Sequence, residues 1–215
     1  MIKSNKYIPA FGHDALTPLY DVAIKWLMPE DRFKRDLIRQ AEIRPGHRVL
    51  DLGCGTGTLT ILAKQAHPDS EVAGLDGDPK VLEIARAKAR KAGIEIAFQE
   101  GMAFQVPYPD GSFDRVLCSL VLHHLTTENK QRTLKEVHRV LRANGELHVV
   151  DFGKPSNFAA YLISLIIRLF EDVKDNIKGL LPEMFARAGF FQIEETARYM
   201  TIVGTLALYK ARKPG

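Results

Sequence analysis

Three glycines stand at alternate positions in the segment VLDLGCGTGT, residues 49–58, directly after an apolar run. Glycine has no Cβ, so Gly53, Gly55 and Gly57 let the backbone turn sharply and approach a ligand closely. The spacing differs from the dinucleotide fingerprint G-x-G-x-x-G, because Thr58 stands three positions after Gly55. This loop therefore favours an adenosine-bearing ligand without phosphates over a pyrophosphate held at a helix N-terminus.

Two acidic residues lie on either side of this loop in the sequence. Asp51 precedes the glycines, and Asp76 ends the next apolar run, 19 residues after Gly57. A carboxylate at the end of a second strand can accept hydrogen bonds from both hydroxyls of a ribose, and Asp51 can bind the ammonium of an amino-acid group directly or through water. Each acid alone could equally cap a loop or end a strand in solvent. The ordered set of strand, glycines, helix, strand and acid indicates a ligand site.

A second group of polar residues follows two later apolar runs. The adjacent His123 and His124 come after a long apolar segment, and Asp151 lies near the end of the run ELHVVDF. A neutral imidazole is a suitable general base, and adjacent side chains point in different directions, so at most one histidine need face a pocket. Either histidine can instead orient its loop, and Asp151 can bind substrate, act as a base or cap the following turn. The histidines lack spaced partners, so no metal site is expected.

The composition is typical of a globular protein with one domain. The chain has 215 residues, of which 46% are hydrophobic and 26% charged, and its net charge is +4. Acidic and basic residues are interspersed, so no nucleic-acid partner is expected. Cys54 and Cys118 have no ligand-like spacing, which makes a reducing cytoplasm the expected location. The apolar stretch 158–170 is shorter than the ~20 residues that span a bilayer. No transmembrane segment is therefore expected, whereas peripheral membrane contact stays open.

Strand-like and helix-like segments alternate along most of the chain. This order predicts a doubly wound α/β fold, with a largely parallel sheet and helices on both faces. Two strand-like runs without a helix between them, 191–200 and 201–213, are expected to end the sheet as an antiparallel hairpin, and residues 1–45 to form helices over the ligand edge. Strands are expected at 47–53, 70–76, 94–100, 113–122 and 146–152, and helices at 57–68, 78–93, 126–145 and 180–190.

Four longer segments contain these residues: VLDLGCGTGTLT, VAGLDGDPKVLEIARAKA, YPDGSFDRVLCSLVLHHL and LKEVHRVLRANGELHVVDF. They resemble the successive motifs of class I S-adenosylmethionine (SAM) methyltransferases. Their order and spacing are most similar to the type 11 group, which includes the ubiquinone/menaquinone C-methyltransferases. The resemblance covers residues 45–152, and the tail matches the family's final antiparallel pair more loosely. The first motif is specific to the cofactor, and none is specific to a substrate.

The resemblance implies a Rossmann-like sheet of seven strands, with the last strand antiparallel and helices on both faces. It implies a single methyltransferase domain over the whole chain, in which 1–45 form a helical cover, 46–152 bind SAM, 153–188 form a cap or helical insertion, and 189–213 form the C-terminal antiparallel strands. The middle of the cap is strongly apolar. It suits an apolar acceptor, a dimer contact, a membrane contact or burial against its own domain.

The resemblance also implies roles for the residues of the loop. Asp51, Gly53 and Gly55 would line the methionine part of SAM, and Asp76 would bind the ribose. The family commonly has an Asp-Ala pair after the third strand. Here Met102 replaces the acid, so its thioether and nearby backbone groups would hold adenine, unless Met102 only fills the core. The expected cofactor-contacting residues are Asp51, Gly53, Cys54, Gly55, Thr56, Gly57, Asp76, Gly77, Met102, Ala103 and Ser119.

Methyl transfer requires mainly that the acceptor is aligned, that water is excluded and, where needed, that a proton is removed. The N-terminal aromatic side chains could stack over the sulfonium of SAM or pack on the edge of the sheet. The catalytic candidates are His123, His124 and Asp151, and the expected substrate-contacting residues are Tyr7, Phe11, Tyr20 and His123.

These features predict a methyltransferase that moves a methyl group from SAM to a small, apolar or aromatic, quinol-like acceptor by in-line displacement and releases S-adenosylhomocysteine (SAH). Two alternatives stay open: a methyltransferase of RNA or protein, and a SAM-binding module without catalysis. Against the first, the chain has no Asn-Pro-Pro-Tyr-like tetrad after the fourth strand and no basic stripe. The protein is expected to act as a monomer or a homodimer.

Overall fold

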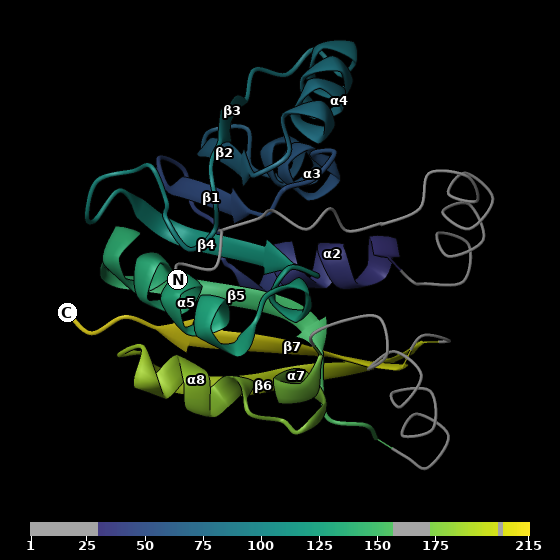
Figure 1. Ribbon diagram of the computed structural model, residues 1–215. Coiled ribbons are helices and arrows are strands. Elements are labelled where there is room, and N and C mark those ends of the chain that lie inside the picture. Colours follow the sequence, from purple (N-terminus) through teal and green to yellow (C-terminus); the bar gives the residue numbers. More distant parts are fainter. Residues whose placement is uncertain (1–29, 157–172, 202–203) are drawn as a thin grey trace, which may run out of the picture.

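The computed structural model describes residues 30–156, 173–201 and 204–215. Within these ranges, seven strands form one sheet in the order β3-β2-β1-β4-β5-β7-β6, with helices packed on both sides (Figure 1). The strands are β1 (Arg48–Leu52), β2 (Glu71–Asp76), β3 (Ala97–Glu100), β4 (Phe113–Ser119), β5 (Leu141–Phe152), β6 (Phe191–Thr201) and β7 (Gly204–Arg212). The helices are α2 (Glu30–Gln40), α3 (Thr58–Ala66), α4 (Pro79–Lys91), the 3-10 helix η1 (Leu122–His124), α5 (Thr127–Val140), α7 (Lys174–Ile177) and α8 (Leu181–Arg187).

Adjacent strands from β3 to β5 are parallel, whereas β7 runs antiparallel to both of its neighbours, β5 and β6. This arrangement confirms the predicted doubly wound sheet with an antiparallel last strand. The chain moves outward from β1 through β2 to β3 and then crosses back to β4 on the other side of β1. The reversal creates a switch point at the carboxyl ends of β1 and β4, which is where open α/β sheets bind ligands.

The central strands are covered on both faces, as their continuous apolar runs predict. Alternate residues of β1 point to opposite sides of the sheet. Leu50 and Leu52 lie in a core shared with α5 and α8, whereas Val49 lies in a core shared with α2 and α3. Figure 1 shows α5 and α8 in front of the sheet and α2 behind it. Packing from both sides holds the strands in place, so their carboxyl ends can position the loops that follow.

Of the N-terminal region that is expected to form helices over the ligand edge, the structure describes residues 30–45, which include helix α2. Helix α2 packs Phe33, Leu37 and Ile38 against a face of the sheet, where it contacts β4, β5 and β7. Phe33 lies about one turn before Leu37 and Ile38, so the three form a stripe along the helix. The stripe is buried because the helix lies along the sheet. Residues 1–29 lie outside the described part of the chain.

Several predicted boundaries were wrong, two of them because the chain changes structure inside the predicted segment. The helix predicted to end at residue 145 ends at Val140, because Leu141 already pairs with β4. The strand predicted to reach residue 122 ends at Ser119, because Leu120 takes a left-handed φ of 58°. That turn ends the strand and directs the chain into η1, at the edge where ligands are expected. Strand β3 is also shorter than predicted, since it begins at Ala97.

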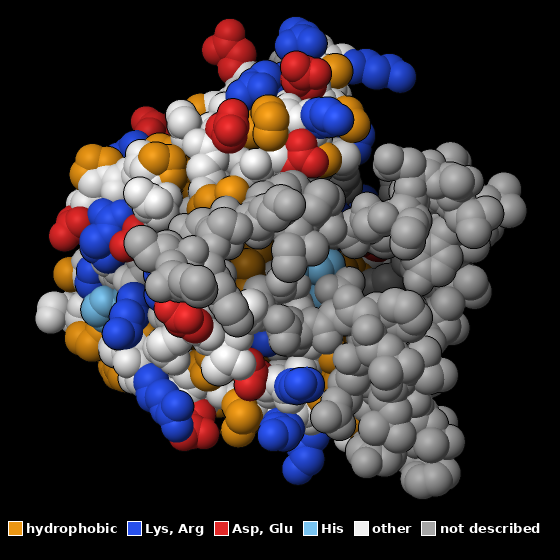
Figure 2. All heavy atoms as spheres, in the orientation of Figure 1, with side chains coloured by type: hydrophobic (Ala, Val, Ile, Leu, Met, Phe, Trp, Pro, Cys, Tyr) orange, Lys and Arg blue, Asp and Glu red, His pale blue; other side chains and the backbone are white. Residues whose placement is uncertain are grey.

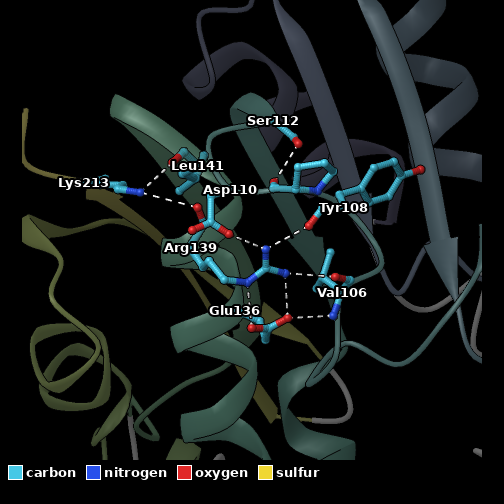
Figure 3. Close-up of polar contacts among 9 residues, drawn as sticks. Val106, Tyr108, Asp110, Ser112, Glu136, Arg139, Leu141 and Lys213 are labelled. Carbon is cyan, nitrogen blue, oxygen red and sulfur yellow. Dashed lines mark hydrogen bonds and ion pairs between the residues drawn. The ribbon is translucent and has the colours of Figure 1, made fainter.

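Arg139 connects the loop after β3 to helix α5 (Figure 3). Its guanidinium donates to both carboxylate oxygens of Glu136 at 2.9 Å, to the carbonyl oxygens of Val106 (2.9 Å) and Tyr108 (2.8 Å), and to Asp110 (2.8 Å). Glu136 in turn accepts the backbone N–H of Val106 at 2.9 Å. The hydrogen bonds from Arg139 hold the pKa of Glu136 below its usual value, although burial acts against them. One planar group thus fixes both the backbone and the side chains of this loop.

We expect Arg139→Lys to lower the free energy of unfolding by about 1–2 kcal/mol, because an ammonium cannot make a planar fork of bonds to carbonyl and carboxylate oxygens. Urea unfolding followed by circular dichroism measures the change. Arg187→Lys is the matched control, since its ion pair with Glu183 is exposed and contributes little. Equal stabilities of the two variants would contradict the anchoring role of Arg139.

Candidate functional site

The loop after β1 turns through three left-handed glycines at the switch point. Gly53, Gly55 and Gly57 have φ values of 70°, 52° and 74°, a region that L side chains rarely adopt. A Cβ on Gly53 would lie 2.4 Å from Cγ2 of Val121, so only hydrogen lets the loop contact the segment after β4. A Cβ on Gly55 would meet no atom of the described residues within 4 Å. Within the described part of the chain, the backbone of Gly55 is therefore open to close approach by a ligand.

Asp76 ends β2 beside this loop, and backbone N–H groups hold its carboxylate. Oδ2 accepts a hydrogen bond from the N–H of Gly55 at 2.8 Å, and Oδ1 accepts one from the N–H of Asp78 at 3.0 Å. A carboxylate oxygen can accept more than one hydrogen bond, so each has capacity for a further donor such as a hydroxyl. The loop after β3 starts at the same place, because the N–H of Gly101 donates to the carbonyl oxygen of Asp76 at 3.0 Å.

Asp51 is a buried carboxyl group on the strand that leads into the glycine loop. It is 1% exposed and accepts a 2.6 Å hydrogen bond from Oγ1 of Thr60 on α3. Burial raises the pKa of Asp51 to about 6, although the Thr60 bond and the charge of Lys34 act in the other direction. The ionised form would gain from a cation placed beside it, such as the ammonium of an amino-acid group.

Ser119 adds an unpaired hydroxyl at the end of β4. Its Oγ is buried and has no hydrogen-bond partner among the described residues. Strands β1 and β4 pair up to Leu52 and Cys118, so Ser119 comes at the next position, level with Gly53. A buried hydroxyl without a partner costs about 1–3 kcal/mol. Its position at the switch point suits a polar ligand that would supply the missing bond.

The remaining residues expected near the cofactor lie around the same loops. The thiol of Cys54 is buried, and burial raises its pKa, so it stays protonated. Oγ1 of Thr56 accepts a 2.7 Å hydrogen bond from Nζ of Lys88 on α4. Met102 lies in a tight turn, which its carbonyl oxygen closes with a 3.0 Å backbone hydrogen bond. Two further expected residues are half-buried, namely Gly77 and Ala103.

The segment after β4 places His123 against Asp151 and leaves His124 exposed. Nδ1 of His123 lies 2.8 Å from Oδ1 of Asp151, and both side chains are buried. Asp151 also accepts hydrogen bonds from the N–H groups of Leu122 (2.8 Å) and Phe152 (2.7 Å). Burial acts to raise the pKa of Asp151, but the His123 ring and these bonds hold it below its usual value. An ionised carboxylate only accepts hydrogen bonds, so Nδ1 carries the hydrogen and Nε2 is the nitrogen that can take a proton.

The sequence analysis missed two residues that hold these side chains. Thr60 bonds to Asp51, and Asn176 donates to Oδ1 of Asp151 at 3.2 Å. No motif marks either residue, because Thr60 lies within a helix and Asn176 is 25 residues from its partner. Other predicted residues fall outside the described ranges: the substrate candidates Tyr7, Phe11 and Tyr20, and residues 157–172 of the expected cap.

The described residues contain neither a cluster of metal ligands nor a helix that could cross a membrane. In residues 30–156, 173–201 and 204–215, no group of three or more His, Cys, Asp or Glu side chains is placed to hold a metal ion. None of the helices described in those ranges has the length and apolar character needed to cross a membrane.

Comparisons with known proteins agree on one family. Residues 49–145 match a family described as a methyltransferase domain. The demethylmenaquinone methyltransferase of Thermus thermophilus is 33% identical over 172 residues, which cover 79% of this chain and 76% of that protein. The 2-phytyl-1,4-naphtoquinone methyltransferase of Nostoc sp. is 32% identical over 184 residues, which cover 80% of each chain.

A solved structure supports the same fold. The crystal structure of magnesium protoporphyrin IX methyltransferase from Synechocystis, with bound SAH, has a TM-score of 0.70 at 21% identity and covers 95% of this chain and 91% of that chain. At this identity, the likeness concerns the fold alone. The sequence relatives, together with the sheet and its glycine loop, show that this chain belongs to the class I SAM-dependent methyltransferases.

Proposed function

We propose that this methyltransferase acts on a small apolar or aromatic acceptor of the quinol type. Two relatives are named for demethylmenaquinone and for 2-phytyl-1,4-naphtoquinone, and the buried imidazole at the sheet edge suits an acceptor that carries an acidic hydroxyl. The observation that carries the proposal is the contact of Gly53 with Val121. It sets the loop assigned to the cofactor directly beside the segment that holds His123 against Asp151.

The residues around the glycine loop fit SAM. Gly55 leaves its backbone open to a ligand, and Asp76 has acceptor capacity on both oxygens for the two ribose hydroxyls. We assign Asp51 to the ammonium of the methionine part and the unpaired Ser119 hydroxyl to a polar group of the same part. The turn at Met102 follows β3 beside Asp76, and we assign it to the adenine side.

When bound, SAM supplies a methyl group on a sulfonium sulfur. The chain's own residues align the acceptor, exclude water and move a proton. We assign the role of proton acceptor to Nε2 of His123. It would take a proton from a hydroxyl of the quinol, which makes the aromatic ring of the quinol a stronger nucleophile. Asp151 would hold the ring and stabilise the imidazolium. The acceptor gains one methyl group and loses one proton in total.

The charge distribution supports a small-molecule acceptor rather than a nucleic acid. On the face seen in Figure 2, Lys and Arg side chains are interspersed with Asp and Glu and form no continuous stripe. Such a surface lacks the electrostatic footprint of a nucleic-acid-binding face. We propose a monomer or homodimer without a nucleic-acid partner. Cys54 and Cys118 are unpaired and buried, which suits a reducing cytoplasm.

Methyl transfer from methyl-labelled SAM to a panel of reduced naphthoquinones, benzoquinones and simple phenols tests the function, with transfer RNA as the control. Label is expected in the quinols and not in the RNA. Label in RNA alone would assign the protein to the macromolecular class. SAM binding without transfer to any acceptor would favour a binding module.

Asp76→Ala should weaken SAM binding by about 1–3 kcal/mol, because the ribose hydroxyls lose a charged acceptor. Calorimetric titration with SAM and with SAH measures the loss. Glu71→Ala, at the exposed start of β2, is the control and should leave both affinities unchanged. If Asp76→Ala bound SAM as tightly as the parent protein, the ribose assignment would be wrong.

Asp51→Asn should have opposite effects on stability and on SAM binding. The pKa of about 6 in the folded protein exceeds the ordinary value of 3.8, so the ionised carboxylate destabilises the fold at neutral pH. The amide oxygen still accepts from Thr60, and the free energy of unfolding should rise by about 1–3 kcal/mol at pH 7. This gain should fade as the pH falls from 6 to 4, while SAM affinity at pH 7 should drop.

Denaturant unfolding across this pH range and calorimetry at pH 7 measure the two effects of Asp51→Asn. A loss of stability at pH 7 would contradict the raised pKa. Undiminished SAM affinity would contradict the contact with the ammonium.

His123→Gln should lower kcat by about 10²- to 10⁴-fold, the usual contribution of a general base, and leave SAM affinity nearly unchanged. Single-turnover methyl transfer and calorimetry measure the two quantities. His67→Gln is the control, because His67 follows α3 at its C-terminal end, away from the carboxyl edge of the strands. Full turnover in His123→Gln would exclude His123 as the base.

A further inference from the structure

The short helix α7 places a buried amide against the carboxylate that holds His123. Asn176 is fully buried, and its Nδ2 donates to Oδ1 of Asp151 at 3.2 Å. The other three donors to Asp151 come from β5 and η1, namely the His123 ring and the N–H groups of Leu122 and Phe152. Among the hydrogen bonds of the described residues, Asn176 makes the one contact to this carboxylate that comes from outside β5 and η1.

Helix α7 is itself held on α5 by the residue before Asn176. Oδ2 of Asp175 accepts a 2.7 Å hydrogen bond from Oγ1 of Thr127 and lies 3.2 Å from Nζ of the buried Lys130. The amide therefore approaches Asp151 from an anchored helix rather than from a free loop. Helix α7 thus contacts α5 through Asp175 and β5 through Asn176.

The contact matters because one oxygen of Asp151 carries three hydrogen bonds. Oδ1 accepts from His123, from the N–H of Phe152 and from Asn176, whereas Oδ2 accepts from Leu122. Without the amide, the carboxylate loses a restraint on rotation about its terminal bond. It also loses a donor that draws negative charge away from the atom facing the imidazole.

We propose that Asn176 is a positioning residue for the proton-accepting imidazole and acts through Asp151. It fixes the carboxylate, and the carboxylate fixes the ring of His123. This inference rests on the proposed role of His123 as the base. The titratable groups that interact with Asp151 besides His123 are His124 from η1, Cys118 from β4 and Tyr209 from β7.

Asn176→Ala and Asn176→Ser test the inference, with Thr127→Val as the matched control. Thr127→Val removes one of the two contacts that Asp175 makes with α5, keeps the contact with Lys130 that holds α7, and leaves the Asn176 amide in place. In Asn176→Ala, kcat should fall about 10- to 100-fold through misplacement of the ring, while KM and Kd for SAM stay within about twofold. Serine retains a short donor and should recover part of kcat, and Thr127→Val should keep it.

The pH dependence supplies a readout that a merely structural residue would not move. The carboxylate of Asn176→Ala is more negative, so it favours the imidazolium. The acidic limb of the kcat profile should therefore shift to higher pH. The NMR titration of the His123 ring, assigned by its loss in His123→Gln, should shift in the same direction without SAM or acceptor. If Asn176→Ala does not fold, the same two measurements on Asn176→Ser decide.

The outcomes separate this inference from the function on which it rests. If the parent protein transfers methyl groups and His123→Gln keeps a normal kcat, His123 is not the general base. The inference about Asn176 then fails as well. A parent protein that methylates no acceptor would refute the proposed function, while the NMR titration would still decide the inference. A strong effect of His123→Gln, with unchanged kcat, pH profile and ring titration in the Asn176 variants, would overturn the inference alone.

Discussion

The close approach of the glycine loop to the segment after β4 is the contact on which the candidate site depends. At Gly53 a Cβ would overlap Val121 at 2.4 Å, so any side chain there would push the two loops apart. The loops can meet because both follow strands that are paired at the centre of the sheet and covered on both faces. A steric requirement at one backbone position thus decides whether the glycine loop and the histidine segment lie together or form two separate surfaces.

Two buried carboxylates at this edge are stabilised in different ways. Asp51 has one side-chain donor, Thr60, and its burial raises its pKa to about 6. Asp151 is equally buried but accepts four hydrogen bonds, one of them from an imidazole, and its pKa stays below the usual value. The first carboxylate has acceptor capacity left for a cationic ligand, whereas the second is committed to orienting a neighbour.

Residues outside the loops hold the loops in place. Arg139 on α5 fixes the loop after β3 through three hydrogen bonds from one guanidinium, which also donates two to Glu136 on its own helix. Asn176 on α7 reaches Asp151 in the same manner, with one polar group aimed at a segment distant in sequence. Such supports restrict backbone and side-chain motion without contacting a ligand, so the geometry of the site depends on helices on the face of the sheet that carries α5 and α8.

The sequence by itself determined the sheet and its antiparallel last strand, because apolar runs and the glycine spacing are patterns of neighbouring residues. It could not determine the ends at Val140 and Ser119, since strand pairing and a left-handed turn decide those positions. Nor could it separate His123 from His124, which are equivalent as neighbours in the chain. Only the tertiary structure distinguishes them: β5 brings Asp151, 28 residues away, to one ring and leaves the other exposed, because contacts between distant residues are set by packing and not by local sequence.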